Sequence, residues 1–220
     1  MIGKGKSISH GTAALEYDLA KEIDGQTAAI EIARHELYGC TGAEMVQEMK
    51  PYHADFPNVK NNCLRFEVSP SIEESATFTD ADWAELGNDF MQRMGLANHQ
   101  YIIIRHSGTE SKKEQAHLHI LANRVSLSGE LYRDNWIGKK ATEAANAIAK
   151  ERNFVQSQDI GKVNKAEIKE AMDGVLKKMQ GFDFTKFKEE LGRRGFKVRE
   201  ARASTGKLNG YYVTARSGTE

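Results

Sequence analysis

The stretch HLHILANRV, residues 117–125, begins with two histidines on either side of Leu118 and continues as an apolar run. A strand advances about 3.3 Å per residue and alternates its faces, so His117 and His119 point to one side while Leu118 points to the other. The β-branched run QYIIIRH, residues 100–106, predicts another strand just before it. The two runs therefore predict an antiparallel pair, with most of the connecting loop in residues 107–114.

Such a hairpin brings His106 back opposite His117, on the same face. Imidazole nitrogens bind ions such as zinc at about 2.0–2.1 Å, and three of them can converge from one hairpin. Three of the seven histidines on one inferred face favour metal or catalytic use over ordinary packing. Three neutral ligands leave coordination positions open, as in catalytic sites. Glu67, on a preceding predicted strand, is the candidate carboxylate; a solvent-facing role is the equal alternative.

Helical patterns surround these strands. Thr12, Thr79 and Asp183 stand where N-caps are expected, and Gly95 and Gly195 where helices stop. The sequence predicts helices at 11–22, 26–39, 41–50, 79–95, 135–153, 164–180 and 184–195, a strand at 62–69 and two strands within 196–215. These elements predict one α+β domain over residues 1–220, with a central antiparallel β-sheet covered by helices.

The bulk composition is that of an ordinary globular chain of 220 residues, 40% hydrophobic and 28% charged. The sequence contains no apolar stretch of the roughly 20 residues that a membrane span needs, and its start lacks a secretory signal. We therefore expect a cytoplasmic protein, with Cys40 and Cys63 reduced and in or near the core. Residues 1–138 hold 13 Lys and Arg against 20 Asp and Glu, whereas residues 139–220 hold 18 against 11. Such asymmetry is compatible with a polyanionic partner and equally with a solvated helical surface.

In their order, several segments resemble the relaxase/mobilisation nuclease family of HUH endonucleases, which is named for a His, hydrophobic residue, His motif. They are ALEY (14–17), RFEVSPSIEES (65–75), FTDADWAELGNDFMQRMG (78–95), HQYIIIRH (99–106), HLHILANRV (117–125), FTKFKEELGRRGFKV (184–198) and STGKLNGYYV (204–213). The resemblance spans essentially the whole chain and is closest to relaxases of mobilisable elements from Bacteroides-type bacteria. Many members carry an Asp two residues after the first His, where this chain has Gly108; Glu110 and Glu114 are candidate substitutes.

The resemblance implies a palm-like HUH fold and DNA nicking at a transfer origin, through a 5′-phosphotyrosyl intermediate that later allows re-joining. It implies a divalent metal on His106, His117 and His119, with Mg or Mn expected and Zn, Ni or Co as alternatives. Because tyrosine has an ordinary pKa of about 10, only about one in a thousand is ionised at pH 7, which explains the need for a cation. Tyr17 matches the position of the nucleophile, and Tyr38 is the reserve.

The expected partners are single-stranded or hairpin DNA, together with accessory mobilisation and coupling proteins. The candidate DNA-binding residues are Arg124, Lys139, Lys140, Arg193, Arg194, Lys197, Arg199 and Lys207. The alternatives are an HUH replication initiator or transposase, a non-catalytic metal- or DNA-binding module, and a zinc hydrolase that activates water. Since the chain ends soon after the last predicted strand, we expect the N-terminal part of a longer protein.

Overall fold

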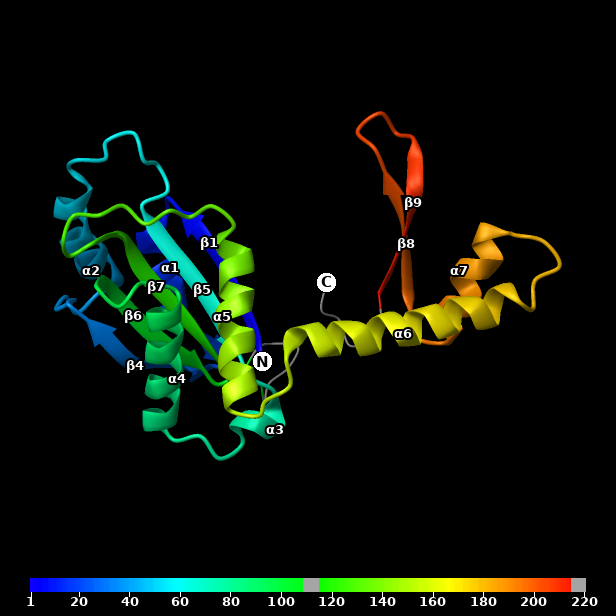
Figure 1. The fold of residues 1–220 in the computed structure, drawn as a ribbon, viewed down its shortest axis with the longest axis horizontal. Helices are drawn as coiled ribbons and strands as arrows, with labels where there is room; N and C mark the ends of the chain where they lie inside the picture. Colours follow the sequence, from blue (N-terminus) through cyan, green and yellow to red (C-terminus); the bar gives the residue numbers. More distant parts are fainter. Residues whose placement is uncertain (109–114, 215–220) are drawn as a thin grey trace. The chain divides into compact units, whose positions relative to one another are not determined.

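The structure is a computed structural model that describes residues 1–108 and 115–214 (Figure 1). Glu110 and Glu114 lie outside the described residues. The chain divides into two compact units, residues 1–157 and 158–220. The first unit holds the central antiparallel sheet and confirms the predicted α+β class. The single domain over residues 1–220 stays a prediction.

The central sheet has five strands in the order β1-β5-β7-β6-β4, and every neighbouring pair is antiparallel. The strands are β1 (Ile2–Ile8), β5 (Cys63–Ser69), β7 (His117–Ser126), β6 (His99–His106) and β4 (Ala29–His35). The histidine-bearing strands β6 and β7 therefore lie in the interior of the sheet, where neighbours on both sides fix their register.

Helices cover both faces of this sheet (Figure 1). On one face, α4 (Asp80–Arg93) and α5 (Ile137–Glu151) bury the side chains of Phe66, Leu118 and Ile120. On the other face, α1 (Gly11–Leu19) and α2 (Gly42–Met49) pack on Ile104 and Leu121. Because strand residues alternate, His117 and His119 lie on the face of α1 and α2 while Leu118 enters the opposite core.

The N-caps agree only in part with the sequence patterns. Thr79 and Asp183 accept backbone hydrogen bonds at the starts of α4 and α7 (Phe184–Arg193), as predicted. The prediction for Thr12 is wrong, because α1 begins at Gly11 and its N-cap residue, His10, makes no side-chain capping bond. The remaining short elements are β2 (Glu22–Ile23), β3 (Gln26–Thr27), the 3₁₀ turn η1 (Lys50–His53) and α3 (Ile72–Ser75).

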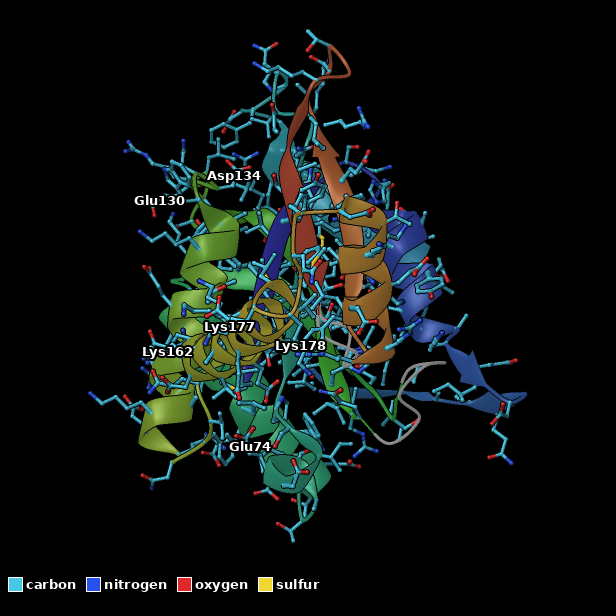
Figure 2. All side chains as sticks on the ribbon, turned by 90° about the vertical axis from the view of Figure 1, so that its right-hand side faces the viewer. Glu74, Glu130, Asp134, Lys162, Lys177 and Lys178 are labelled. Atoms are coloured by element: carbon cyan, nitrogen blue, oxygen red, sulfur yellow. The ribbon has the colours of Figure 1, made fainter. Side chains whose placement is uncertain are left out.

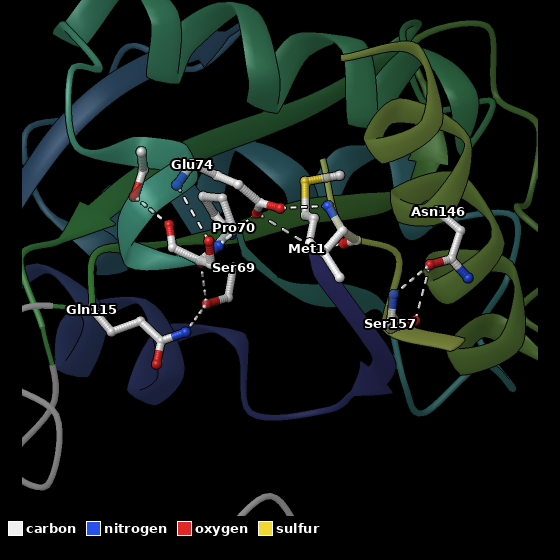
Figure 3. A network of polar contacts seen from close by, with 10 residues as sticks. Met1, Ser69, Pro70, Glu74, Gln115, Asn146 and Ser157 are labelled. Carbon is white, nitrogen blue, oxygen red and sulfur yellow. Dashed lines mark hydrogen bonds and ion pairs between the residues drawn. The ribbon is translucent and has the colours of Figure 1, made fainter. Parts of the chain in front are cut away.

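Two glycines let β1 approach its neighbours closely. A Cβ added to Gly3 would lie 2.5 Å from the carbonyl oxygen of Ala141 on α5, and one added to Gly5 would lie 2.8 Å from the ring of Phe66. The start of β1 is held by a polar network in which the Met1 ammonium lies 3.6 Å from the Glu74 carboxylate (Figure 3). These contacts set the position of the lysines that alternate with the two glycines.

The helix predicted over residues 26–39 is wrong, because the structure has β3 and β4 there. Ala and Glu in this segment favour helix, but the pairing of β4 with β6 outweighs that preference. The apolar–polar–apolar order of Ile30, Glu31 and Ile32 is also the alternation expected of a strand. Before them, Asp24 and Gly25 have φ of 53° and 74° and form the tight turn between β2 and β3. An Asp-Gly pair is a strong hairpin signal.

The two cysteines differ in their surroundings. Cys63 is buried, as expected, and burial raises the pKa of its thiol to about 11. Both are free cysteines, but the core position expected for Cys40 is wrong, since that residue is exposed in the loop before α2.

The second unit is built from α6 (Ser157–Leu176), α7, β8 (Lys197–Arg202) and β9 (Leu208–Thr214). Its own small core includes Val175, Phe187 and Leu191, and the two strands form the predicted hairpin with Gly206 at φ 81°. The helix α6 begins at Ser157 rather than at Asn164; Lys162 lies on it, and Lys177 and Lys178 follow its last residue (Figure 2). None of the helices within the described residues is long and apolar enough to cross a membrane.

Candidate functional site

Three histidines meet on the α1-facing side of the sheet. His106 on β6 pairs directly with His117 on β7, which confirms the predicted register, and His119 lies two residues further along β7. One ligand nitrogen from each ring lies within 4.8 Å of the others. The relative exposure of His106 is 2% and that of His117 is 6%, so water has little access to these two rings.

The hydrogen bonds of the three rings indicate where their protons reside. Nδ1 of His117 donates to the carbonyl oxygen of Gln115 at 3.1 Å, which leaves its Nε2 with a lone pair. That Nε2 lies 3.1 Å from Nε2 of His119. Two nitrogens at about 2.0–2.1 Å from one ion must lie within about 4.2 Å of each other, a condition that this pair meets. The residues therefore fit a cation held by imidazole nitrogens.

Burial favours the uncharged state that metal binding requires in two of the three rings, those of His119 and His106. Burial lowers the pKa of His119 to about 2, and the neighbouring charges of His106, His117, Arg65 and Lys4 act in the same direction. Burial also lowers the pKa of His106, although its hydrogen bond to the Asp18 backbone opposes this. At neutral pH, these two imidazoles carry no proton that a cation would have to displace.

A carboxylate that the sequence patterns did not single out lies next to the trio. Asp18, at the end of α1, has a relative exposure of 1%. Both of its carboxylate oxygens accept hydrogen bonds from Arg65 on β5, from Nε at 3.0 Å and from Nη2. The same Nη2 lies 3.4 Å from Nδ1 of His119, and Oδ1 of Asp18 lies 3.9 Å from that nitrogen.

The backbone of Asp18 ties α1 directly to the trio. Nε2 of His106 donates to the carbonyl oxygen of Asp18 at 2.7 Å. Burial raises the pKa of the Asp18 carboxyl, and the hydrogen bond from Arg65 offsets part of that effect. In the sequence, the only signal for Asp18 is its place beside Tyr17, and the signal for Arg65 is its shared strand face with Glu67.

Tyr17 precedes Asp18 on α1 and is 60% exposed, with Nζ of Lys21 at 5.8 Å from its ring centroid. Tyr38 is 76% exposed in the loop after β4, and its hydroxyl donates to Glu36 at 3.0 Å. That hydrogen bond raises the pKa of Tyr38, which disfavours the phenolate. Of the two candidate nucleophiles, Tyr17 is the one whose neighbour in sequence contacts the histidine trio.

Glu67 pairs with His119 in the register of β5 and β7, so it lies on the face of the trio. Its carboxylate is 3.1 Å from Nζ of Lys4 on β1. The carboxylate that lies near the ring of His119 is therefore that of Asp18, whose Oδ1 is 3.9 Å from Nδ1, whereas the Glu67 carboxylate is paired with Lys4. A pocket of about 190 Å³, lined in part by Lys4, Lys6, Arg65, Glu67 and His119, opens beside the trio.

The candidate DNA-binding residues of the first unit lie apart from the trio. Arg124 is seven residues beyond His117 on β7 and belongs to the opposite face. Its guanidinium donates to Asp134 (labelled in Figure 2) at 2.6 Å and to the carbonyl oxygens of Tyr132 and Asn61. On α5, Lys139 lies 3.7 Å from Glu143, and Lys140 donates to the carbonyl oxygen of Arg133.

In the second unit, the candidate cations fall into two groups. Arg194 donates to the carbonyl oxygen of Ala171 at 3.2 Å, a contact within the unit, and Arg193 pairs with Glu190. Lys197 and Arg199 on β8 pair with Thr214 and Tyr212 on β9, on the face opposite Val198 and Val213. Arg199 lies 4.9 Å from the ring centroid of Tyr212, which is 54% exposed. Lys207 lies in the turn between the two strands.

Comparisons with known proteins give a family and a set of solved structures. The family model for the MobA/VirD2-like relaxase nuclease domain matches residues 17–154. Among solved structures, complexes of the conjugative relaxase TrwC with oriT DNA match 94% of this chain. The metal-bound complex is 14% identical to this chain with a TM-score of 0.37, and the match covers 74% of the TrwC chain. The metal-free complex is 11% identical with a TM-score of 0.41, and the match again covers 74% of the TrwC chain. The comparison with curated proteins finds no match.

The family match includes Tyr17, Asp18 and the entire β6–β7 hairpin with its three histidines. It covers more than half of the chain, and the members of the family are DNA-nicking enzymes. This chain therefore belongs to the relaxase family, with a nuclease domain of the MobA/VirD2-like type.

Proposed function

We propose that this relaxase nicks one DNA strand at a transfer origin through the hydroxyl of Tyr17 and later re-joins the strand. The observation that carries the proposal is the histidine trio, which lies within 4.8 Å across one hairpin and is hydrogen-bonded to the residue that follows Tyr17. A nucleophile on a helix that is fixed to the trio can meet a phosphate held there in a defined orientation.

Under this proposal, His106, His117 and His119 hold one divalent cation. When bound, the cation supplies positive charge at the nonbridging oxygens of the scissile phosphate. Mg²⁺ or Mn²⁺ is the expected ion, with Zn²⁺, Ni²⁺ or Co²⁺ as alternatives that suit imidazole donors. The neutral rings contribute lone pairs without adding negative charge that would repel the phosphate.

The proposed chemistry is a transesterification. The Tyr17 oxygen forms a bond to phosphorus as the bond from phosphorus to the 3′ oxygen breaks. The phenolic proton leaves to solvent, which the exposure of Tyr17 permits, and the 3′ oxygen takes up a proton. The products are a free 3′-OH and a 5′-phosphotyrosyl link, and the reverse reaction re-forms the strand.

DNA binding is assigned to several cationic surfaces. The exposed face of the β8–β9 hairpin presents Lys197 and Arg199 beside Tyr212, a combination of cations for phosphates and a ring for base stacking. We include Lys139, Lys140, Lys207, Arg124, Arg193 and Arg194 as weaker candidates, because contacts within the protein engage most of them. Glu67 stays a candidate carboxylate beside the trio, and accessory mobilisation and coupling proteins are the expected protein partners.

The test uses an end-labelled single-stranded oligonucleotide that spans the cognate origin, with Mg²⁺ or Mn²⁺ added. Wild-type protein is expected to form a denaturation-resistant covalent adduct, and Tyr17→Phe is expected to lose it while keeping DNA binding. Tyr38→Phe is the matched control and is expected to form the adduct. An adduct that persists in Tyr17→Phe contradicts the assignment. Cleavage without an adduct favours a water-activating hydrolase, and binding without cleavage favours a non-catalytic module.

A further inference from the structure

Strand β1 presents two lysines on the face that carries the histidine trio. Lys4 pairs with Glu67 in the β1–β5 register, and Glu67 pairs in turn with His119 across β5 and β7. Lys6 pairs with Arg65 in the same way. Strands β1 and β7 are separated by β5, that is by two inter-strand spacings, so the Cα atoms of Lys4 and His119 lie about 10 Å apart. Lys4, Lys6, Arg65 and His119 all line the pocket of about 190 Å³ beside the trio.

The charges in this pocket do not cancel. Lys4 is paired with Glu67 at 3.1 Å, and Arg65 is paired with the buried carboxylate of Asp18. Lys6 is exposed and forms no ion pair with any residue in the described parts of the chain. Arg65 uses Nε and Nη2 for Asp18, and no described residue accepts a hydrogen bond from its Nη1. The lining residues and their partners therefore leave one net positive charge at the pocket, and Arg65, which lines it, keeps N–H donors without an acceptor among the described residues.

We propose that Lys6, assisted by Lys4 and the Nη1 group of Arg65, forms a binding subsite for a DNA backbone phosphate. The phosphate is a neighbour, along the same single strand, of the one that the trio positions. This inference rests on the proposed function for the identity of the strand, but it concerns binding and not cleavage. Lysine is a compact point charge that suits phosphate oxygens, and Arg65 supplies directed N–H groups beside it.

The sequence of β1 supports such a use. The glycines of β1 face α5 and Phe66, where any Cβ would clash, and its lysines face the pocket. The Gly-Lys-Gly-Lys alternation therefore gives the strand one face that packs on the core and one face that can bind a ligand. The alternative role for these lysines is to prevent edge-to-edge pairing, because β1 is an edge strand of the sheet. That role predicts self-association of a lysine variant with unchanged DNA binding.

The experiment measures binding of a fluorescein-labelled oligothymidylate by anisotropy, in EDTA and over a range of salt concentrations. Each phosphate contact to a single strand contributes about 0.7 to the slope of log affinity against log salt. Lys6→Gln is therefore expected to lower that slope by about 0.7 and to weaken binding about fivefold at 0.1 M salt. Glu67→Gln is expected to act in the opposite direction, since it frees Lys4 from its partner.

The matched control is Lys150→Gln, which removes the same charge from the exposed end of α5, in the layer on the opposite face of the sheet. Its expected effect on the slope is close to zero. Three results would each overturn the subsite: a salt slope that is unchanged in Lys6→Gln, an equal loss of DNA affinity in Lys6→Gln and Lys150→Gln, or no DNA binding by the wild type. Because the assay needs neither Tyr17 nor a metal, a failure of the nicking proposal leaves its outcome unaffected and is recognised separately by a missing adduct.

Discussion

The carbonyl oxygen of Asp18 accepts a hydrogen bond of 2.7 Å from Nε2 of His106, although 88 positions separate the two residues. One bond therefore connects the helix of the proposed nucleophile to a proposed metal ligand. The Asp18 side chain adds a second connection through Arg65, whose Nη2 reaches His119 at 3.4 Å. An arginine N–H only donates, so Nδ1 of His119 accepts in this contact. For Nε2 to bind a cation, the ring proton must move to Nδ1, where Oδ1 of Asp18, 3.9 Å away, is the acceptor that it would face.

We predict that Asp18→Asn impairs both metal affinity and the formation of the Tyr17 adduct by about 10- to 100-fold, the range found for partners that orient metal ligands. The amide keeps the shape but loses the charge that holds Arg65 and favours a proton on Nδ1. Calorimetric metal titration and single-turnover adduct formation measure the two effects. Asp89→Asn, which breaks a surface pair with Arg93 at 2.8 Å, is the control. Unchanged metal affinity in folded Asp18→Asn would rule out this positioning role.

A bound cation should stabilise the first unit. An ion present at 100 times its dissociation constant adds about 2.7 kcal/mol to the free energy of unfolding, and a chelator removes that gain. We expect Mn²⁺ to raise the unfolding temperature of the wild type, and His117→Asn to abolish the rise. His10→Asn removes an exposed histidine that makes no capping hydrogen bond, and it should respond like the wild type. An equal rise in His117→Asn would place the ion elsewhere.

The site could be predicted from sequence where its signal was local. The runs QYIIIRH and HLHILANRV have strand alternation and a loop of fitting length, so the pairing of His106 with His117 followed from spacing alone. The amphipathic pattern behind Thr79 likewise gave α4. Asp18 and Arg65 had no such signal, because 47 positions separate them and only the packing of α1 on the sheet brings them together.

Two strands of the central sheet, β1 and β4, escaped prediction for different reasons. β4 carries residues with good helix propensity, and its strand conformation depends on hydrogen bonds to β6. β1 alternates glycine with lysine, so it lacks the apolar alternation that marks a half-buried strand. Its buried face is supplied by glycines that let α5 come close. Both lie at sheet edges, where long-range contacts outweigh the local pattern.

The first unit should lose stability as the pH falls below about 6.5 in a metal-free buffer. The pKa values of His119 and His106 are lowered from 6.5 in the folded chain, so the unfolded chain takes up protons that the folded chain does not. Each such histidine contributes a slope of up to about 1.4 kcal/mol per pH unit. Asp18, with a raised pKa, acts in the opposite direction nearer to its usual value of 3.8.

Urea unfolding between pH 7 and pH 5 measures this slope. Tryptophan fluorescence reports the first unit alone, since both tryptophans, Trp83 and Trp136, lie within it. His119→Asn should reduce the slope of unfolding free energy against pH by the contribution of one histidine, up to about 1.4 kcal/mol per pH unit. His10→Asn should leave the slope as in the wild type. An equal slope in His119→Asn and the wild type would contradict the lowered pKa of His119.

The close contact between β1 and α5 gives a prediction that is independent of metal and DNA. Gly3→Ala places a Cβ 2.5 Å from the carbonyl oxygen of Ala141 and 2.6 Å from the Cβ of Ala145, so strand and helix must move apart. We expect a loss of about 1–3 kcal/mol in the free energy of unfolding, the usual cost of overpacking. Gly138→Ala on α5 is the matched control, because its Cβ would meet only the Gly5 carbonyl oxygen, at 3.5 Å. A helical Gly-to-Ala change there should be neutral or stabilise by up to about 1 kcal/mol. Equal effects of the two substitutions in urea unfolding would show that β1 does not depend on this approach.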